Sequence, residues 1–274
     1  MTKKVNGAIN PLDGRYFDKT RPLAEYFSEQ ALMKYRVMME GEYLIALSAL
    51  GKTALRKFTP VEIKIVRELY EKFDDASYEE IKKLEATTNH DVKAVEYILK
   101  EKLSKTSLKD CIEWLHFAIT SEDTNNISHA LTLSDSLGKV LIPEISKIIQ
   151  ELNSLAKKNA DLPMLARTHG QSASPTTFGK EMKVFVARLE RKLNELKNIK
   201  IQAKLNGATG NYNAHVAAYP NIDWVGFSEK FIESFNKPKA RSCKLEANLI
   251  TTQIECHDSY VTIFDTVRHI NTIL

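Results

Sequence analysis

The chain has 274 residues, 43% of them hydrophobic and 27% charged, and its 39 basic and 35 acidic side chains leave a net charge of +4. These values are typical of a soluble globular protein with one large or two ordinary domains. The basic residues are spread along the chain rather than gathered in one stripe, which argues against nucleic acid as a partner, and no apolar run approaches the roughly 20 residues needed to span a membrane.

The N-terminal residues include lysines but no apolar stretch, so they do not have the form of a secretory signal. The cysteines are Cys111, Cys243 and Cys256, and their odd number without Cys-x-x-Cys pairing favours free thiols in a reducing compartment. The histidines lack metal-ligand spacing, so no metal is expected. The sequence therefore predicts a cytoplasmic globular protein.

The first part of the chain predicts short, capped helices. Residues 58–73 begin with a start signal, with Thr59 as the cap, Pro60 at the first helical position and Glu62 as the capping-box partner. In residues 91–103 apolar side chains recur at helical spacing, at Val92, Val95, Leu99 and Leu103. Both segments are expected to be helices.

Longer amphipathic helices are expected after Gly138, where Pro143 opens the next segment. Its apolar stripe consists of Ile145, Ile148, Ile149, Leu152 and Leu155. A second stripe begins at Thr177 and continues through Met182, Phe185, Val186, Leu189, Leu193 and Leu196. Helices this long usually pack against similar helices, which favours a bundle. Convincing strands are absent, and the glycines of residues 206–220 predict a loop.

These elements predict an all-α fold with a boundary near Asp110. Residues 1–110 would form a small helical N-terminal domain, and residues 111–274 a long-helix bundle domain. The last helix has one apolar face of Val261, Phe264, Val267 and Ile270 and ends at Leu274 without a glycine cap, proline or polar tail. We therefore expect the bundle to be incomplete at its C-terminus.

Polar clusters lie at several of the expected helix ends. Residues 13–16 form either a turn with a solvated Arg15 or a site where Arg15 and Tyr16 bind a phosphate or carboxylate. Residues 87–91 let Asn89 cap the following helix, next to Asp91. His90 is then either solvated or hydrogen-bonded to an anion at the helix N-terminus.

A further cluster allows the same pair of readings. In residues 120–126, Thr120 and Ser121 either cap a helix or, with free backbone N–H groups, cradle an anion. The flanking His116 and His129 are expected to pack or to lie in solvent. In residues 251–255, the amide of Gln253 could bind a carboxylate or a base edge.

Other histidines near the chain's end have structural interpretations. His257 and Asp258 could cap the last helix. His215 and His269 are expected to be structural.

The segment ARTHGQSASPTTFGKEM (166–182) is richer in hydroxyls than one helix cap requires. His169 is expected on irregular backbone, and Gly170 would let the chain approach a ligand closely. Histidine readily exchanges protons near neutral pH, so a loop histidine among hydroxyls, starting with Thr168, predicts a proton donor.

Six segments in this order resemble the adenylosuccinate lyases, members of the fumarase/aspartase superfamily. The segments are PLDGRY (11–16), TTNHDVKAVEY (87–97), HFAITSEDTNNISHAL (116–131), RTHGQSASPTTFGKEM (167–182), NGATGNYNAHVAAYP (206–220) and TTQIECHD (251–258). The resemblance implies a bundle of the fumarase/aspartase type and a homotetramer with active sites shared between subunits. It also implies β-elimination of fumarate from adenylosuccinate and from SAICAR, with no cofactor.

The resemblance also implies roles for individual residues. His169 matches the family's general acid, and His90 a histidine that binds and orients the substrate. Thr120 and Ser121 match donors to the substrate's carboxylates. Arg15 and Tyr16 match groups that bind the phosphate-bearing part of the substrate. The remaining substrate-binding matches are Asp91, Thr168 and Gln253.

Two departures from the family accompany these matches. The family's catalytic base is a serine in a mobile loop of the type Gly-Ser-Ser-x-Met-Pro-x-Lys-x-Asn-Pro, and no such pattern occurs here. This chain is therefore expected to be an N-terminal portion that is inactive alone. Cys256 also stands where the family often has proline. A sister lyase and a non-catalytic helical adaptor are the alternatives.

Overall fold

Short helices precede long ones along the chain, as the sequence predicts. The computed structural model describes residues 9–237 and 243–274. Single 3-10 turns lie at Arg21–Leu23 and Ile112–Trp114. The helices of the first part are α1 (Phe17–Thr20), α2 (Ala24–Phe27), α3 (Glu29–Leu50), α4 (Pro60–Glu71), α5 (Asp75–Thr88) and α6 (Asp91–Ser104).

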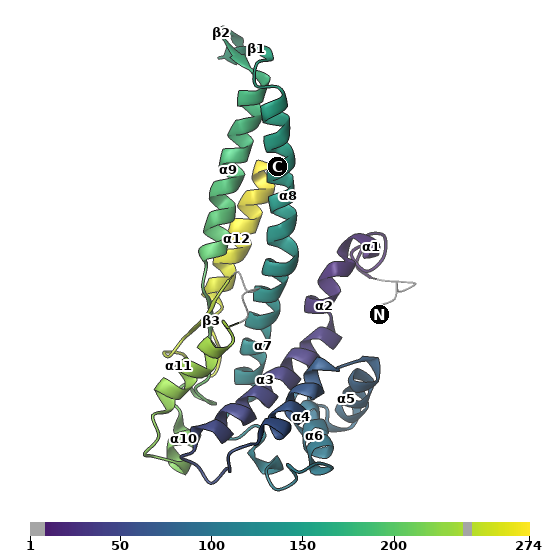
Figure 1. Ribbon diagram of the computed structural model, residues 1–274, viewed down its shortest axis with the longest axis vertical. Coiled ribbons are helices and arrows are strands. Elements are labelled where there is room, and N and C mark those ends of the chain that lie inside the picture. The colour runs from purple at the N-terminus through teal and green to yellow at the C-terminus, as the bar shows by residue number, and fades with distance from the viewer. Residues whose placement is uncertain (1–8, 238–242) are drawn as a thin grey trace.

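Long helices and two small strand pairs follow. The helices are α7 (Ser121–Ser136), α8 (Ile142–Lys158), α9 (Phe178–Asn198), α10 (Asn213–Ala218), α11 (Trp224–Ser234) and α12 (Asp258–Ile273). The strands are β1 (Pro163–Thr168), β2 (Gln171–Thr177), β3 (Ile201–Ala203) and β4 (Leu245–Ala247). Figure 1 shows α8, α9 and α12 packed side by side as a long rod, with the β1–β2 hairpin at its far end. The helical-bundle prediction is confirmed.

The helix start signals are confirmed atom by atom at α4. The Thr59 N–H donates to Glu62 Oε2 (2.9 Å), and the Glu62 N–H donates to Thr59 Oγ1 (3.3 Å). The apolar stripe predicted for α6 is also confirmed, because its side chains are buried in the core: Val92, Val95, Leu99 and Leu103.

No break separates α7 from α8. The π-helical residues Leu137–Leu141 join them into one continuous helix. Pro143 has no N–H to donate one turn back, and the wider π turn before it keeps the chain helical without that bond. One helix therefore runs from residue 121 to residue 158.

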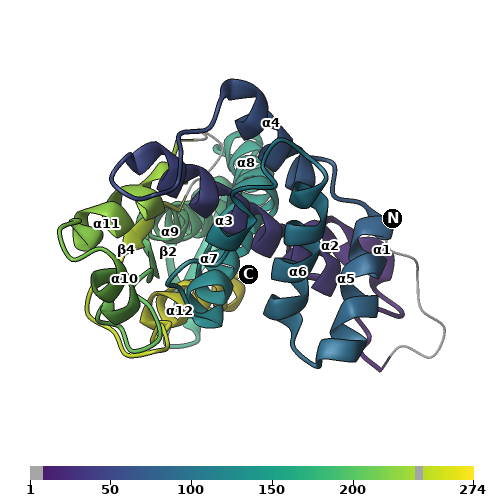
Figure 2. The same ribbon diagram turned by 90° about the horizontal axis from the view of Figure 1, so that it is seen from below.

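A single hydrophobic core runs through both halves of the described chain. Seen from below, α3 lies in the centre, with α5 and α6 on one side and α10 and α11 on the other (Figure 2). Buried side chains of α3, such as Tyr43 and Leu44, belong to the same cluster as Ile127 and Leu131 of α7. The domain boundary near Asp110 stays a prediction.

Two local predictions were wrong. Strands do occur: β1 and β2 form an antiparallel hairpin and β3 and β4 a short parallel pair. The hairpin side chains are mostly exposed, so no alternation of buried and exposed positions marks it in the sequence. Within residues 206–220, α10 occupies part of the expected loop.

The apolar face of α12 also differs from the predicted one. Ile263 and Ile270 are buried, whereas Val261 and Phe264 are 58% and 59% exposed. The cause is that α12 packs against α9 through a stripe displaced around the helix from the one that the sequence suggested. Among the described helices, none is long and apolar enough to cross a membrane.

Candidate active site

The first turn of α7 gathers several of the polar segments. Thr120 precedes the helix, and its N–H donates to Asp123 Oδ2 (2.9 Å) in a capping box. Asp123 also accepts the N–H groups of Asn206 (3.2 Å) and Gly207 (3.1 Å). Residues 120–126 and 206–207 therefore meet at the start of α7, with Ser121 as its first residue.

Gln253 joins the same place through its backbone. Its carbonyl accepts a hydrogen bond from the Lys204 ammonium group (2.8 Å), while its side chain is exposed. His257 lies just before α12 with a φ of 62° and makes no side-chain cap, so the capping role predicted for it was wrong. Burial, with Arg36 and His257 nearby, lowers the pKa of His129. The His129 side chain is exposed, one of the two places predicted for it.

His90, rather than Asn89, caps α6. Asn89 ends α5 in the left-handed region (φ 50°), which asparagine tolerates better than most residues. The Lys93 N–H donates to Nδ1 of His90 (3.2 Å), so the neutral ring carries its proton on Nε2. The His90 side chain is half exposed and can offer Nε2–H to a ligand.

Arg36, which the sequence analysis missed, connects His90 to α7. Its guanidinium contacts Asp91 Oδ2 (2.6 Å) and donates to Asn125 Oδ1 (2.9 Å). Arg36, His90 and Asp91 share a cavity of about 370 Å³ with residues of α3 and α5. No sequence motif marks Arg36, because it lies within the regular apolar pattern of α3.

His116 proves to be ion-paired rather than merely packed. Its Nδ1 lies 2.6 Å from Oε1 of the buried Glu40, which also accepts the Thr124 hydroxyl (2.7 Å). Burial lowers the pKa of His116, but the hydrogen bond and charge of Glu40 outweigh that effect and leave the pKa raised. The other oxygen of Glu40, Oε2, is buried without a hydrogen-bond partner. Through Thr124 this pair contacts the first turn of α7.

His215 is structural, as predicted. It is 1% exposed, and its Nε2 lies 3.1 Å from the Tyr43 hydroxyl, which donates to the Phe117 carbonyl (2.9 Å). Because the Tyr43 hydroxyl proton is used in that bond, His215 donates from Nε2 to the Tyr43 oxygen. Its buried Nδ1 has no hydrogen-bond partner. Burial lowers the pKa of His215 to about 4.

We expect His215 to make the fold sensitive to acid. An unfolded histidine has a pKa near 6.5, so below that pH His215 is protonated in the unfolded chain. In the folded chain it becomes protonated only near pH 4. Stability should fall as the pH drops through this window, by about 3 kcal/mol at most. Urea denaturation of residues 1–274 between pH 7 and 4.5 measures it.

His215→Phe is the matched control, because phenylalanine fits the surrounding aromatic rings and cannot titrate. Its stability should change less over the same pH range. An equal slope in both proteins would contradict this assignment.

His169 occupies the turn of the β1–β2 hairpin. Thr168 pairs with Gln171, so the loop has two residues, His169 (φ 52°) and Gly170 (φ 74°). Positive φ at both positions is the requirement of a type I′ turn. A Cβ added at Gly170 would meet nothing within 4 Å, so within one chain this glycine serves the turn and not a close approach. His169 is exposed.

The hydroxyls after His169 have mixed roles. Thr177 caps α9, since it accepts the Lys180 N–H (3.2 Å). The others lie along β2, a largely exposed strand. Figure 1 places this hairpin, with Thr168, at the opposite end of the rod from α10 and the start of α7. One chain therefore does not bring His169 to His90, Thr120 or Gln253.

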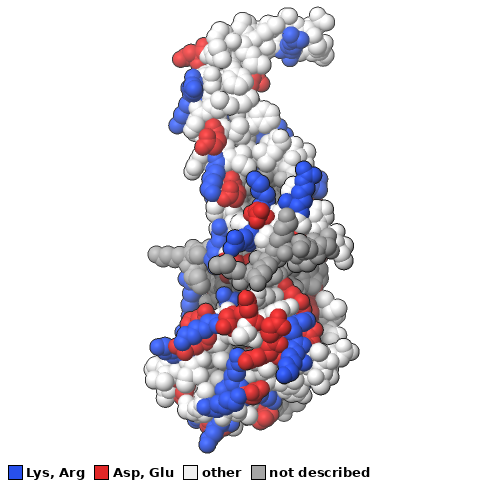
Figure 3. All heavy atoms as spheres, turned by 90° about the vertical axis from the view of Figure 1, so that its right-hand side faces the viewer, with Lys and Arg blue, Asp and Glu red and all other residues white. Residues whose placement is uncertain are grey.

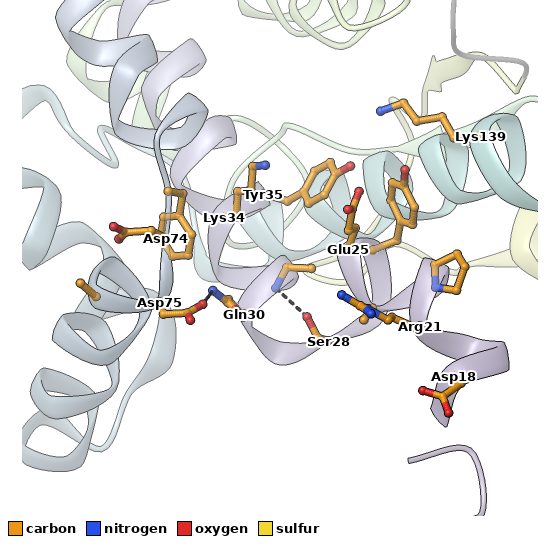
Figure 4. Close-up of a pocket in the computed structure, with 16 residues that line it drawn as sticks. Asp18, Arg21, Glu25, Ser28, Gln30, Lys34, Tyr35, Asp74, Asp75 and Lys139 are labelled. Atoms are coloured by element: carbon orange, nitrogen blue, oxygen red, sulfur yellow. Dashed lines mark hydrogen bonds between the residues drawn. The ribbon is translucent and has the colours of Figure 1, made fainter. Parts of the chain in front are cut away.

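Arg15 and Tyr16 lie apart from both places. Both are exposed, and the Arg15 guanidinium stacks 5.5 Å from the Tyr16 ring just before α1. A cavity of about 950 Å³ lies nearby between α1–α3 and the start of α5 (Figure 4). Its lining mixes bases such as Lys34 and Lys139 with acids such as Asp74, and it includes none of the predicted site residues.

Charged groups are mixed elsewhere as well. On the face in Figure 3, Lys and Arg alternate with Asp and Glu over the lower half, and the hairpin end is mostly uncharged. That face has no continuous basic stripe in its described part.

Comparison with known proteins relates this geometry to one family. A family model described as "Lyase" matches residues 14–274. An adenylosuccinate lyase of Haemophilus influenzae is 47% identical over 97% of this chain and 57% of its own length, and one of Dictyostelium discoideum is 44% identical over the same shares. The chain thus spans less than three fifths of the curated relatives that it matches.

Solved structures show the same fold at low identity. The β-carboxy-cis,cis-muconate cycloisomerase from Acinetobacter calcoaceticus sp. ADP1 superposes with a TM-score of 0.65 at 20% identity, over 90% of this chain and 53% of that one. A fumarate lyase from Mesorhizobium sp. BNC1 gives 0.62 at 18% identity, over 93% and 53%.

Proposed function

This chain belongs to the lyase family, and on that premise we propose that it acts in purine nucleotide biosynthesis. The reaction is the β-elimination of fumarate, from adenylosuccinate to give AMP and from SAICAR to give AICAR. The observation that carries the proposal is the 44–47% identity to adenylosuccinate lyases over nearly the whole chain. A cytoplasmic location and the absence of a cofactor belong to the same proposal.

The separation of the predicted site residues supports an active site built from several copies. Residues 121–158 form one helix, which at about 1.5 Å per residue extends roughly 55 Å. His169 lies beyond its end and Thr120 at its beginning. A nucleotide is far shorter than this, so His169 must meet the groups around α7 from another copy. We propose a homotetramer for this purpose.

Exposed apolar side chains on the rod support the same assembly. Monomeric proteins rarely leave large apolar patches in water. The exposed side chains include Ile148 (37% exposed), Leu155 (40%), Val184 (42%), Phe185 (36%) and Phe264 (59%). We propose that these faces are covered by helices of neighbouring copies and by the segment that the relatives have in addition.

The elimination needs three chemical groups. A base removes the proton next to a carboxylate, donors stabilise the charge that builds on that carboxylate, and an acid protonates the departing amine. His169 is the proposed acid, and the two-residue turn presents it to an incoming partner. Thr120 and Ser121, with backbone N–H groups of the first turn of α7, are the proposed carboxylate donors.

The remaining groups would hold the substrate. His90 offers Nε2–H, and Asp91 is fixed beside it by Arg36. Gln253 and Thr168 would add hydrogen bonds, each from its own side of the shared site. Arg15 and Tyr16 would bind the phosphate.

The family's serine base is the missing component. No segment of residues 1–274 has the Gly-Ser-Ser-x-Met-Pro pattern, so we expect this stretch alone to be inactive. The test is fumarate release from adenylosuccinate by the complete gene product, meaning the chain read to its natural stop codon. Release supports the lyase proposal. No release from a folded, oligomeric product would contradict it and favour a sister lyase or the adaptor.

His90→Asn should separate binding from folding. Asparagine also caps helices well, so α6 should remain stable, but the Nε2–H donor is lost. A hydrogen bond to a charged group contributes about 1.5–3 kcal/mol, so kcat/KM for adenylosuccinate should fall roughly 10- to 100-fold. Steady-state kinetics of the complete product measure it. An unchanged kcat/KM would remove His90 from the site.

A further inference from the structure

Lys204 and Asp123 form an ion pair that no solvent reaches. Both side chains are 0% exposed, and Lys204 Nζ lies 2.9 Å from Asp123 Oδ1. Nothing in the proposed elimination uses Lys204. A lysine is almost never fully buried without a specific partner.

Lys204 uses each of its three donors. Besides Asp123, its ammonium group contacts the Gly207 carbonyl (3.0 Å) and the Gln253 carbonyl (2.8 Å). Asp123 in turn accepts the N–H groups of Thr120, Asn206 and Gly207. Apart from the ion pair itself, all these hydrogen bonds join the two side chains to main-chain groups. The main-chain groups belong to three segments, at Thr120, at residues 206–207 and at Gln253.

Two more contacts bring the same segments together. Asn206 donates through Nδ2 to the Thr251 hydroxyl (2.8 Å). Gly210 lies against the backbone of residues 251–252, since an added Cβ would fall 2.2 Å from the Thr251 carbonyl oxygen. The loop 206–210 is thus packed between the start of α7 and the segment 251–253.

A buried ion pair is a poor way to gain stability. Removing two charges from water costs about as much as their attraction returns, and well-packed apolar residues are often as stable. What the pair does provide is a fixed spacing, because each of its contacts has a defined length and direction. Here the pair fixes the distance from the start of α7, with Thr120 and Ser121, to the segment of Gln253.

We propose that Lys204 is a positioning residue that holds the Gln253 segment at a fixed distance from the hydroxyls of Thr120 and Ser121. The proposal rests on the proposed function in one respect, namely that these groups bind the substrate together. Lys204 itself touches no substrate. Its loss should weaken substrate binding more than it slows the chemical step.

The test uses the double variant Lys204→Met with Asp123→Asn in the complete gene product. Neither buried position then carries an unpaired charge, so folding should survive. We expect KM for adenylosuccinate to rise at least about 10-fold, with a smaller change in kcat. Thr251→Val loosens the same packing without touching the charges, and it should shift KM in the same direction by less.

Cys256 supplies a readout that needs no activity. It lies three residues after Gln253 and is the exposed one of the cysteines, while Cys111 and Cys243 are buried. Its reaction with Ellman's reagent should become several-fold faster in the double variant and in Thr251→Val. The matched control is Arg56→Met with Glu62→Gln. It removes the ion pairs of Arg56 with Glu62 (2.7 Å) and Asp110 (2.8 Å) near the start of α4 and should change neither KM nor labelling.

The outcomes separate the two proposals. Faster Cys256 labelling with a raised KM supports the positioning role. Unchanged labelling and KM in both variants would overturn it. If the unmodified product releases no fumarate, the proposed function fails, and the labelling rates alone still decide whether Lys204 fixes this segment.

Discussion

His169→Asn should lower kcat for fumarate release by the complete gene product at least about 100-fold, the usual range for the loss of a general acid. Asparagine is the sharpest replacement because His169 has a φ of 52° in a two-residue turn. Asparagine followed by glycine is a preferred sequence for such a turn. The hairpin should therefore stay intact while the proton donor disappears.

A control must show that the fall in kcat comes from the missing proton donor and not from a change in folding or assembly. His269→Asn is a matched control, since His269 is an exposed histidine of α12 outside the proposed site, and it should leave kcat unchanged. The unmodified product, His169→Asn and His269→Asn should have the same circular dichroism spectrum and the same sedimentation behaviour. If His169→Asn retains normal kcat, the general acid lies elsewhere and the hairpin serves only assembly.

Gly179→Ala should destabilise the rod although alanine is the better helix former. Gly179 lies in the first turn of α9, where an added Cβ would fall 2.3 Å from the Ala156 carbonyl oxygen and 2.7 Å from Asn159 O. Alanine gains about 1 kcal/mol of helix propensity over glycine. Overpacking against backbone costs about 1–3 kcal/mol or more, and at these distances we expect the clash to dominate.

Thermal denaturation of residues 1–274 measures this effect. We expect a melting temperature several degrees lower, from about 2–4 °C per kcal/mol in proteins near this size. Gly41→Ala is the control in a second helix, because there the nearest atom is a side-chain methyl group of Val66 at 3.0 Å, which can shift. Equal melting temperatures for both variants would show that α8 and α9 separate easily.

Features that depend only on neighbouring residues in the sequence were predicted correctly. The cap at Thr59, the apolar stripe of α6 and the long α9 follow from side-chain spacing and capping chemistry alone. The face of α12 could not be predicted in the same way, because its apolar residues surround much of the helix and only the position of α9 selects Ile263 over Phe264.

The candidate site residues were chosen for their polar character at helix ends, and their roles stay predictions. The sequence marks His90 and Thr120 because polar residues gather at helix ends. It does not mark Arg36, Glu40 or Lys204, since each lies in a segment that otherwise has the composition of core, and their partners are far away in the chain. The hairpin was missed because exposed strands carry no alternation, and its turn was recognisable only from His169–Gly170.

The unbroken helix from residue 121 to residue 158 has a consequence for how activity would depend on the amount of protein. If catalysis needs both ends of this helix, and they come from different copies, an isolated copy contributes nothing. Activity per molecule would then fall as the complete product is diluted below the concentration at which its copies dissociate. Under such dilution a cell making half as much of the protein would retain less than half of the activity.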